Sequence, residues 1–229
     1  MASFARNLNH MDVESKTDEF RNALERNAST YGVALTAANI DGLTNYYRLL
    51  MAWNSRLHLV APTSPVELAT RHVLESLMLL AHLPSGAAVA DIGSGGGLPV
   101  IPCLIVRPDL RAVLIEASLR KTVFLREALR GVLVPEPASP ETVRARVVAE
   151  RFENVAPPVV DFVTCRALER FEETAPKLLD WAPKDASFLL FGGEGLGKSI
   201  AGSGLSARPI LLPNSEQRFL YIIARDEQA

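Results

Sequence analysis

The chain has 229 residues, of which 48% are hydrophobic and 22% are charged, and its formal net charge is −2 at pH 7. This length allows a sizeable core, and the near-neutral charge argues against unspecific coating of nucleic acid, although a local basic patch can coexist with it. The first twenty residues are polar and no run reaches about eighteen apolar residues, so we expect a cytoplasmic protein without signal peptide or membrane span.

Before residue 85 the apolar residues recur at helical spacing. Ile40, Leu43 and Tyr47 share one face, and residues 66–80 repeat the pattern after Pro65, a residue that favours the first turn of a helix. We therefore expect a helical extension over residues 1–84, packed in one structural unit on a core domain over residues 85–229.

Beyond residue 85, short apolar runs alternate with helix-length segments, which is typical of an α/β fold with a mostly parallel sheet. Two stretches rich in proline or glycine, 132–142 and 192–213, are expected to be mobile loops. Cys103 and Cys165 lie in apolar surroundings, so we expect reduced buried thiols and no metal site. The expected strands are 88–92, 112–116, 146–149, 159–165, 187–191 and 219–224.

The first expected strand contains Asp91 and runs into Gly93-Ser94-Gly95-Gly96-Gly97. A backbone this rich in glycine can approach a ligand closely and direct free N–H groups at it. A dinucleotide fingerprint is excluded because Leu98 stands where its third glycine belongs. Asp91 would repel a pyrophosphate and attract an ammonium group, and the spacing resembles the first motif of S-adenosylmethionine (SAM) methyltransferases. A glycine turn without a ligand is the alternative.

Two further strand ends are candidates for the same cofactor. Glu116 lies about twenty residues after the glycine turn, where doubly wound folds place an acid against ribose hydroxyls; a solvated acid is the alternative. After the third strand, Phe152 can stack on adenine while Glu150 or Glu153 accepts a hydrogen bond from its amine, unless this is an ordinary polar loop. The expected cofactor residues are Asp91, Gly93, Ser94, Gly95, Gly97, Leu98, Glu116, Arg151, Phe152, Glu153 and Arg166.

A competing motif lies in residues 192–199, which fit the phosphate-loop pattern G-x-x-x-x-G-K-S. A phosphate loop needs a following helix whose N-terminus holds the phosphates. The segment after Ser199 contains Gly202 and Gly204 and is a poor helix former. We therefore reject a nucleotide triphosphatase and expect a flexible glycine loop beside the active site.

Four motifs occur in a characteristic order: Arg71-His72-x-x-Glu75-Ser76, Asp91-x-Gly-x-Gly-x-Gly-Leu-Pro, Glu116 with Arg120-Lys121-x-x-Phe124-Leu125, and Cys165-Arg166-Ala167. Together they resemble the RsmG (GidB) family of bacterial small-subunit ribosomal RNA guanine-N7 methyltransferases, over about residues 46–225. One departure is Phe191-Gly192-Gly193, because the family has a Lys-Gly pair after its fifth strand.

The resemblance implies a Rossmann-like SAM methyltransferase fold, in which a mostly parallel seven-stranded sheet carries helices on both faces. It also implies an enzyme that methylates the N7 atom of one guanine in the decoding-region loop of 16S rRNA, within or near the small ribosomal subunit. We expect it to act as a monomer.

Guanine N7 carries a lone pair and no proton, so attack on the methyl group of SAM needs positioning and no general base. Arg166, after the fourth strand, is expected to contact guanine or phosphate; a salt bridge with Glu169 or Glu172 is the alternative. His72 is expected to help position the substrate, or else to pack in the core. Further candidates for RNA contact, unless they are only solvated, are Arg71, Arg120, Lys121 and Lys198.

Two other functions stay open from the residues alone. One is a SAM enzyme that acts on a small molecule or a protein, and the other is a noncatalytic protein that binds SAM or a nucleotide. The fold does not separate them, because one fold hosts many functions.

Overall fold

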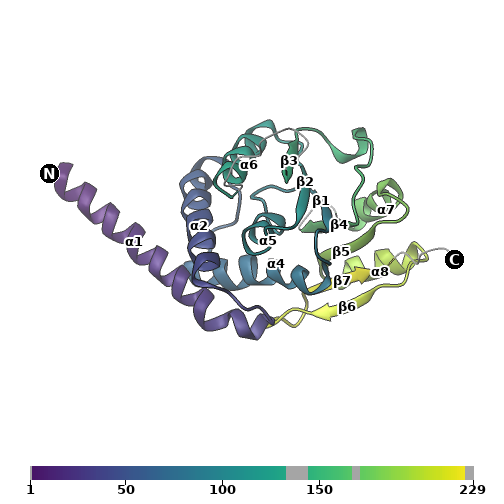
Figure 1. Cartoon of the computed structure of the whole chain (residues 1–229), viewed down its shortest axis with the longest axis horizontal. Helices are drawn as coiled ribbons and strands as arrows, with labels where there is room; N and C mark the ends of the chain where they lie inside the picture. Colours follow the sequence, from purple (N-terminus) through teal and green to yellow (C-terminus); the bar gives the residue numbers. More distant parts are fainter. Residues whose placement is uncertain (1, 133–143, 167–170, 225–229) are drawn as a thin grey trace.

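The computed structural model describes residues 2–132, 144–166 and 171–224 (Figure 1). Its centre is a seven-stranded sheet in the order β3-β2-β1-β4-β5-β7-β6. Strands β1 to β5 pair in parallel, and β7 runs antiparallel between β5 and β6. The expected mostly parallel sheet is confirmed. The strands are β1 (Ala88–Ile92), β2 (Arg111–Ile115), β3 (Ala145–Val148), β4 (Phe162–Arg166), β5 (Ser187–Gly192), β6 (Arg208–Leu211) and β7 (Phe219–Ile223).

Alternation along the strands directs side chains into two hydrophobic cores, one on each face of the sheet. On β1, Val89 belongs to the first core, whereas Ala90 and Ile92 belong to the second. The first core also holds the apolar sides of the N-terminal helices, so these helices cover one face of the sheet. The second core holds residues of α7 (Phe171–Trp181) and α8 (Glu194–Gly202), which cover the opposite face.

The N-terminal helices begin where the sequence supplies caps. Thr36 and Asn39 bond each other's backbone at the start of α2, and Ser64 accepts from Glu67 N with Pro65 in the first turn of α3. Figure 1 shows α1 reaching away from the body of the molecule at its N-terminal end. The remaining helices are α1 (Ala2–Asn27), η1 (Ala28–Tyr31), α2 (Ala37–Leu57), α3 (Pro65–Glu67), η2 (Leu68–Leu74), α4 (Glu75–Leu77), η3 (Met78–His82), α5 (Val100–Val106), α6 (Leu119–Val132) and η5 (Phe152–Asn154).

The expectation for residues 192–213 is wrong, because this stretch contains α8 and the edge strand β6. Residues 194–199 of the phosphate-loop pattern lie inside α8, which places Lys198 and Ser199 in its second turn and not at its N-terminus. Gly197 serves packing, since a Cβ there would lie 2.8 Å from the Tyr221 hydroxyl. The position of this pattern inside α8 is therefore a stronger argument against a phosphate loop than the low helix propensity after Ser199. Most of the other expected loop, 132–142, lies outside the described residues.

Among the described helices, none is both long and apolar enough to cross a membrane. Cys103 and Cys165 are both buried, as expected, and neither forms a disulfide in the described part of the chain. The absence of a disulfide between them agrees with their positions in the two hydrophobic cores, which lie on opposite faces of the sheet.

Candidate functional site

The glycine turn follows the carboxyl end of β1, at the edge where parallel strands present ligand-binding loops. Gly93, Gly95 and Gly97 have φ angles of 69°, 52° and 82°, a region that side chains disfavour. The N–H groups of Gly93 and Ser94 donate to the carbonyl of Ile115 at 2.9 and 3.3 Å, which fastens the turn to β2. The glycines therefore hold a specific backbone shape.

Two of these glycines also allow close packing. A Cβ on Gly97 would lie 2.2 Å from the Ile101 side chain on α5, and one on Gly96 would lie 3.3 Å from Leu50 on α2. The buried Tyr46, also on α2, donates its hydroxyl to the carbonyl of Gly96 at 2.5 Å. The N-terminal extension thus contributes directly to the turn. Sequence reasoning missed Tyr46 because a tyrosine on an apolar helix face gives the same pattern as a core residue.

Asp91 is fully buried, and neither of its carboxylate oxygens has a hydrogen-bond partner among the described residues. The Ser94 hydroxyl donates to the Asp91 main-chain carbonyl at 3.0 Å. Burial raises the pKa of Asp91 to about 8, and the negative charge of Glu116 adds to the rise. Both Asp91 and burial raise the pKa of Tyr46. A buried carboxyl group without a donor is costly, and it would gain most from a cationic ligand.

Glu116 bridges two loops. One carboxylate oxygen accepts from Gly95 N at 2.9 Å, and the other accepts from Ser118 N at 2.7 Å. Only 8% of the residue is exposed, so the alternative of a solvated acid at a strand end is wrong. Each oxygen can still accept a further hydrogen bond, since a carboxylate has about four lone-pair sites.

One cleft of about 390 Å³ is lined by five of the expected cofactor residues, Gly93, Glu116, Arg151, Phe152 and Glu153. The other expected residues do not line it: Asp91, Ser94, Gly95, Gly97, Leu98 and Arg166. Phe152 is mostly buried and packs edge-on against Trp181, with ring centroids 5.5 Å apart. Glu150 accepts from Arg151 N and from the side chain of Asn154, whereas Glu153 is exposed. The lining residues are Ile92, Gly93, Ile115, Glu116, Ala117, Ser118, Lys121, Glu150, Arg151, Phe152, Glu153 and Thr174.

The expected RNA-contacting cations separate in space. Lys121 lines the cleft beside Glu116, whereas Arg120, one residue earlier on α6, is exposed. Lys198 is exposed on α8. Arg71 forms an exposed ion pair with Glu67 one turn earlier in the same helical segment. These cations do not form one cluster around the cleft.

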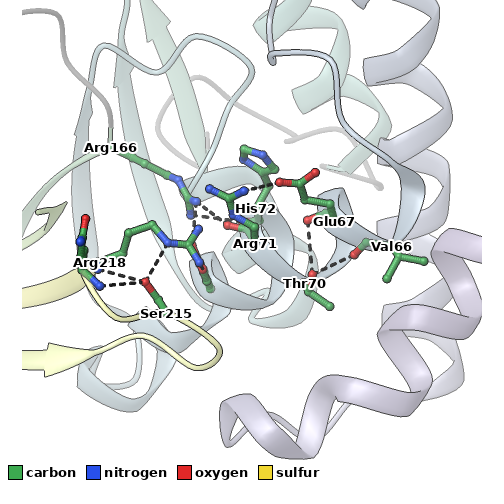
Figure 2. Close-up of polar contacts among 10 residues, drawn as sticks. Val66, Glu67, Thr70, Arg71, His72, Arg166, Ser215 and Arg218 are labelled. Atoms are coloured by element: carbon green, nitrogen blue, oxygen red, sulfur yellow. Dashed lines mark hydrogen bonds and ion pairs between the residues drawn. The ribbon is translucent and has the colours of Figure 1, made fainter.

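Arg166 reaches from the end of β4 to the N-terminal helices, and Figure 2 shows it pointing to the backbone at Arg71 and His72. Its guanidinium donates to the main-chain carbonyls of both residues, with the His72 contact at 3.5 Å. These carbonyls belong to η2, a π-helical turn, and such turns are frequent at functional sites. Arg166 also lies over the Phe191 ring, 5.2 Å from its centroid. The guanidinium is therefore held from two sides.

The carboxylate partner of Arg166 is Glu75, at 2.9 Å, and Glu75 is fully buried. Glu169, one of the alternative partners, lies outside the described residues, and the side chain of Glu172, the other, is not described. The second oxygen of Glu75 forms an ion pair with Arg218 at 3.0 Å. Burial raises the pKa of Glu75, while both arginines oppose the rise. Sequence reasoning gave no role to Arg218, because a lone arginine before a strand carries no spacing signal.

His72 is half-buried next to this group. Burial and the charges of Arg166 and Arg71 together lower its pKa to about 4, so the imidazole is neutral at pH 7. Its carbonyl accepts from Arg166 and from the Ser76 hydroxyl.

Leu98, the last expected cofactor residue, is buried in the first core next to Pro99, with a cis peptide bond between them.

Comparisons with known proteins show which proteins the chain is similar to. The family model described as rRNA small subunit methyltransferase G matches residues 39–203. The chain is 41% identical over 148 residues to the Ribosomal RNA small subunit methyltransferase G of Xanthomonas axonopodis pv. citri, covering 64% of this chain and 65% of that protein. It is 38% identical to the protein of the same name from Gluconobacter oxydans, covering 66% of this chain and 72% of that protein. The match thus spans less than two thirds of the Xanthomonas protein.

Solved structures support the fold alone. The S-adenosylmethionine-dependent methyltransferase SibL in its apo form has a TM-score of 0.54 at 12% identity, covering 82% of this chain and 76% of that one. TYW2 of P. horikoshii in complex with MeSAdo has a TM-score of 0.51 at 13% identity, covering 66% of this chain and 62% of that one. These likenesses confirm a Rossmann-like methyltransferase fold.

Proposed function

Because this chain belongs to the GidB family of rRNA small subunit methyltransferases, we propose that it transfers a methyl group from SAM to the RNA of the small ribosomal subunit. The acceptor in this proposal is the N7 atom of one guanine in the decoding-region loop of 16S rRNA. The family match supports the RNA substrate class, and the choice of N7 rests on the motifs that resemble guanine-N7 methyltransferases.

The observation that carries the cofactor assignment is the buried Asp91 carboxyl group without a donor, directly before the glycine turn. An ammonium group supplies the donor and the opposite charge that this position lacks. SAM carries such an ammonium group, and when bound it supplies an electrophilic methyl group. The residues present fit this cofactor, with Asp91 for the ammonium group and Glu116 for the ribose hydroxyls.

The adenine end would lie in the cleft beside Phe152. Glu150 already accepts two hydrogen bonds from its own loop, while Glu153 is the alternative acceptor for the adenine amine. Arg151 lines the same cleft and is exposed. Lys121 also lines it, so we assign Lys121 to the cofactor side and keep Arg120, Arg71 and Lys198 as candidates for RNA contact.

The chain's own residues act by positioning. Guanine N7 has no proton to remove, and alignment of two reactants can lower a barrier by ~7–11 kcal/mol. His72, neutral at pH 7 and held beside Arg166, can act as a hydrogen-bond partner for the base without adding charge. Arg166 and Arg218, which share the carboxylate of Glu75, lie near the end of β4 and attract the RNA backbone.

The test is incubation of the protein with methyl-labelled SAM and small subunits that lack the modification, followed by nucleoside mass spectrometry. We expect label in 7-methylguanosine of the rRNA, and loss of that label with Asp91→Asn. Label at another atom of the RNA would refute the N7 assignment. Label in a protein or metabolite, with none in rRNA, would refute the RNA substrate and favour the other SAM-dependent function.

A further inference from the structure

Three segments far apart in the sequence meet at one buried carboxylate. Glu75 begins α4, Arg166 ends β4, and Arg218 lies just before β7. Each oxygen of Glu75 faces one guanidinium nitrogen, at 2.9 Å for Arg166 and 3.0 Å for Arg218. Arg166 donates a hydrogen bond to one oxygen, whereas Arg218 meets the other as an ion pair whose geometry is not that of a hydrogen bond. Two cations at these distances stabilise a negative charge on the carboxylate. This geometry favours the ionised form.

The two arginines differ in how much of their hydrogen-bonding capacity the protein uses. Arg166 is 14% exposed, and its described hydrogen bonds go to two carbonyls of η2 and to Glu75. The Arg218 side chain is 28% exposed, and its described contacts go to Ser215 (Figure 2) and to Glu75. Its five N–H groups therefore leave more donors for a ligand. Arg166 is the fixed member of the pair, and Arg218 is the accessible one.

The charges in this group do not balance. Two guanidinium groups share one carboxylate, which leaves an excess of one positive charge, and the neighbouring His72 is neutral at pH 7. Arg71, also adjacent, is paired with Glu67. A partly buried site with a net positive charge favours an anion, and planar guanidinium groups suit a phosphate.

We propose that Glu75 is a positioning residue for the methyl acceptor: it holds Arg218 against the fixed Arg166, and Arg218 then binds one phosphate of the RNA. This inference rests on the proposed function and extends it to a named phosphate contact. The Ser215 hydroxyl supports Arg218 from the other side, since it accepts from the Arg218 main-chain N–H at 3.0 Å and from its Nε at 3.1 Å.

The first test compares Glu75→Gln with two controls. Glu75→Gln keeps the shape but leaves two guanidinium groups facing each other without a countercharge, so we expect the KM for small subunits to rise about tenfold or more. The affinity for SAM, measured by calorimetry, should change less than about twofold. Glu75→Asp keeps the carboxylate, so its KM for small subunits should rise less than that of Glu75→Gln. Thr44→Ala removes a buried hydroxyl from α2, outside this group, and should leave the KM for small subunits unchanged.

The second test separates positioning from folding. If Glu75 acts through the arginine pair, Arg218→Gln relieves the repulsion that Glu75→Gln creates. The KM of the double variant for small subunits should then rise by less than the product of the two fold-changes that the single variants show. If the two fold-changes in KM simply multiply in the double variant, Glu75 does not act through Arg218, and the positioning role is overturned. It is also overturned if Glu75→Gln reduces SAM affinity and thermal stability as much as it raises the KM for small subunits.

The third test identifies the ligand class. Loss of one phosphate contact should reduce the slope of log KM against log salt concentration by ~0.7–0.9 in Arg218→Gln. An unchanged slope with a raised KM would show that Arg218 contacts a base, and the phosphate assignment would be wrong.

Failure of the proposed function gives a different result from failure of this inference. If the protein without substitutions does not methylate rRNA, the proposed function fails. The arginine pair is then tested by filter binding of protein-free small-subunit rRNA, where Glu75→Gln should weaken retention about tenfold and Thr44→Ala should not. If methylation proceeds and Glu75→Gln leaves the KM for RNA unchanged, only the inference about Glu75 fails.

Discussion

The cofactor cleft and the arginine group around Glu75 differ in how the chain builds them. The cleft takes its residues from the ends of three consecutive strands, between Ile92 and Glu153, with Thr174 from α7. The arginine group takes one residue each from α4, the end of β4 and the turn before β7. The first is a local motif of the parallel sheet, and the second exists only because the antiparallel strand β7 returns beside β5. Motif reading therefore finds the cleft, but in the arginine group it does not connect Glu75 with Arg166 and it misses Arg218.

The largest expected effect tests the cofactor side. Asp91→Asn should weaken SAM binding at least about 100-fold, because the buried ammonium group loses its countercharge. Calorimetry measures the affinity, and Glu75→Gln serves as the matched change on the acceptor side. The two sites would not be separate if both variants weakened SAM binding equally.

The second prediction concerns the shape of the glycine turn. Gly97→Ala adds a Cβ that would lie 2.2 Å from Ile101, on top of a φ of 82°. Gly86→Ala is the matched control, with a φ of 73° and open space around it. We expect Gly97→Ala to lower the free energy of unfolding by at least ~2 kcal/mol and Gly86→Ala by ~1 kcal/mol, measured by urea denaturation. Equal losses would mean that close packing at the turn is unimportant.

The third prediction concerns pH. The folded-state pKa of Asp91, about 8, exceeds its ordinary value, so the native protein binds the proton more tightly than the unfolded chain. Stability from this group is present below ~pH 4 and is lost as the pH rises to about 8, with a slope of up to ~1.4 kcal/mol per pH unit. Asp91→Asn should lack this slope in denaturation without SAM. A parallel pH dependence in both proteins would contradict the pKa assignment.

The smallest expected effect concerns Phe191, which stands at the place of the family's Lys-Gly pair. Phe191→Leu should lower stability by ~1 kcal/mol through lost ring contacts with Arg166. Phe191→Lys should also reduce methyl transfer, because it adds a buried cation beside that guanidinium. Thermal unfolding and the methylation assay measure the two effects. Higher activity with Phe191→Lys would mean that the missing lysine matters more than the ring.

Much of the fold follows from local pattern. The run of apolar residues at β1 has the predicted bounds, and Thr36 and Ser64 mark helix starts because their side chains cap free N–H groups. Strand β6 was missed because its exposed residues and Pro209 resemble a loop. Helix α8 was missed because its glycines reduce helix propensity, while packing against Tyr221 compensates.

By itself, the sequence determined the α/β fold and the chemistry expected at the glycine turn, because strand periodicity and glycine spacing are local properties of the chain. Only the tertiary structure decided that Asp91 lacks a donor, that Tyr46 closes on the turn, and that Glu75 joins two distant arginines. Burial and ion pairing depend on which segments meet across the sheet. That information belongs to strand order and helix packing, and no short stretch of residues contains it.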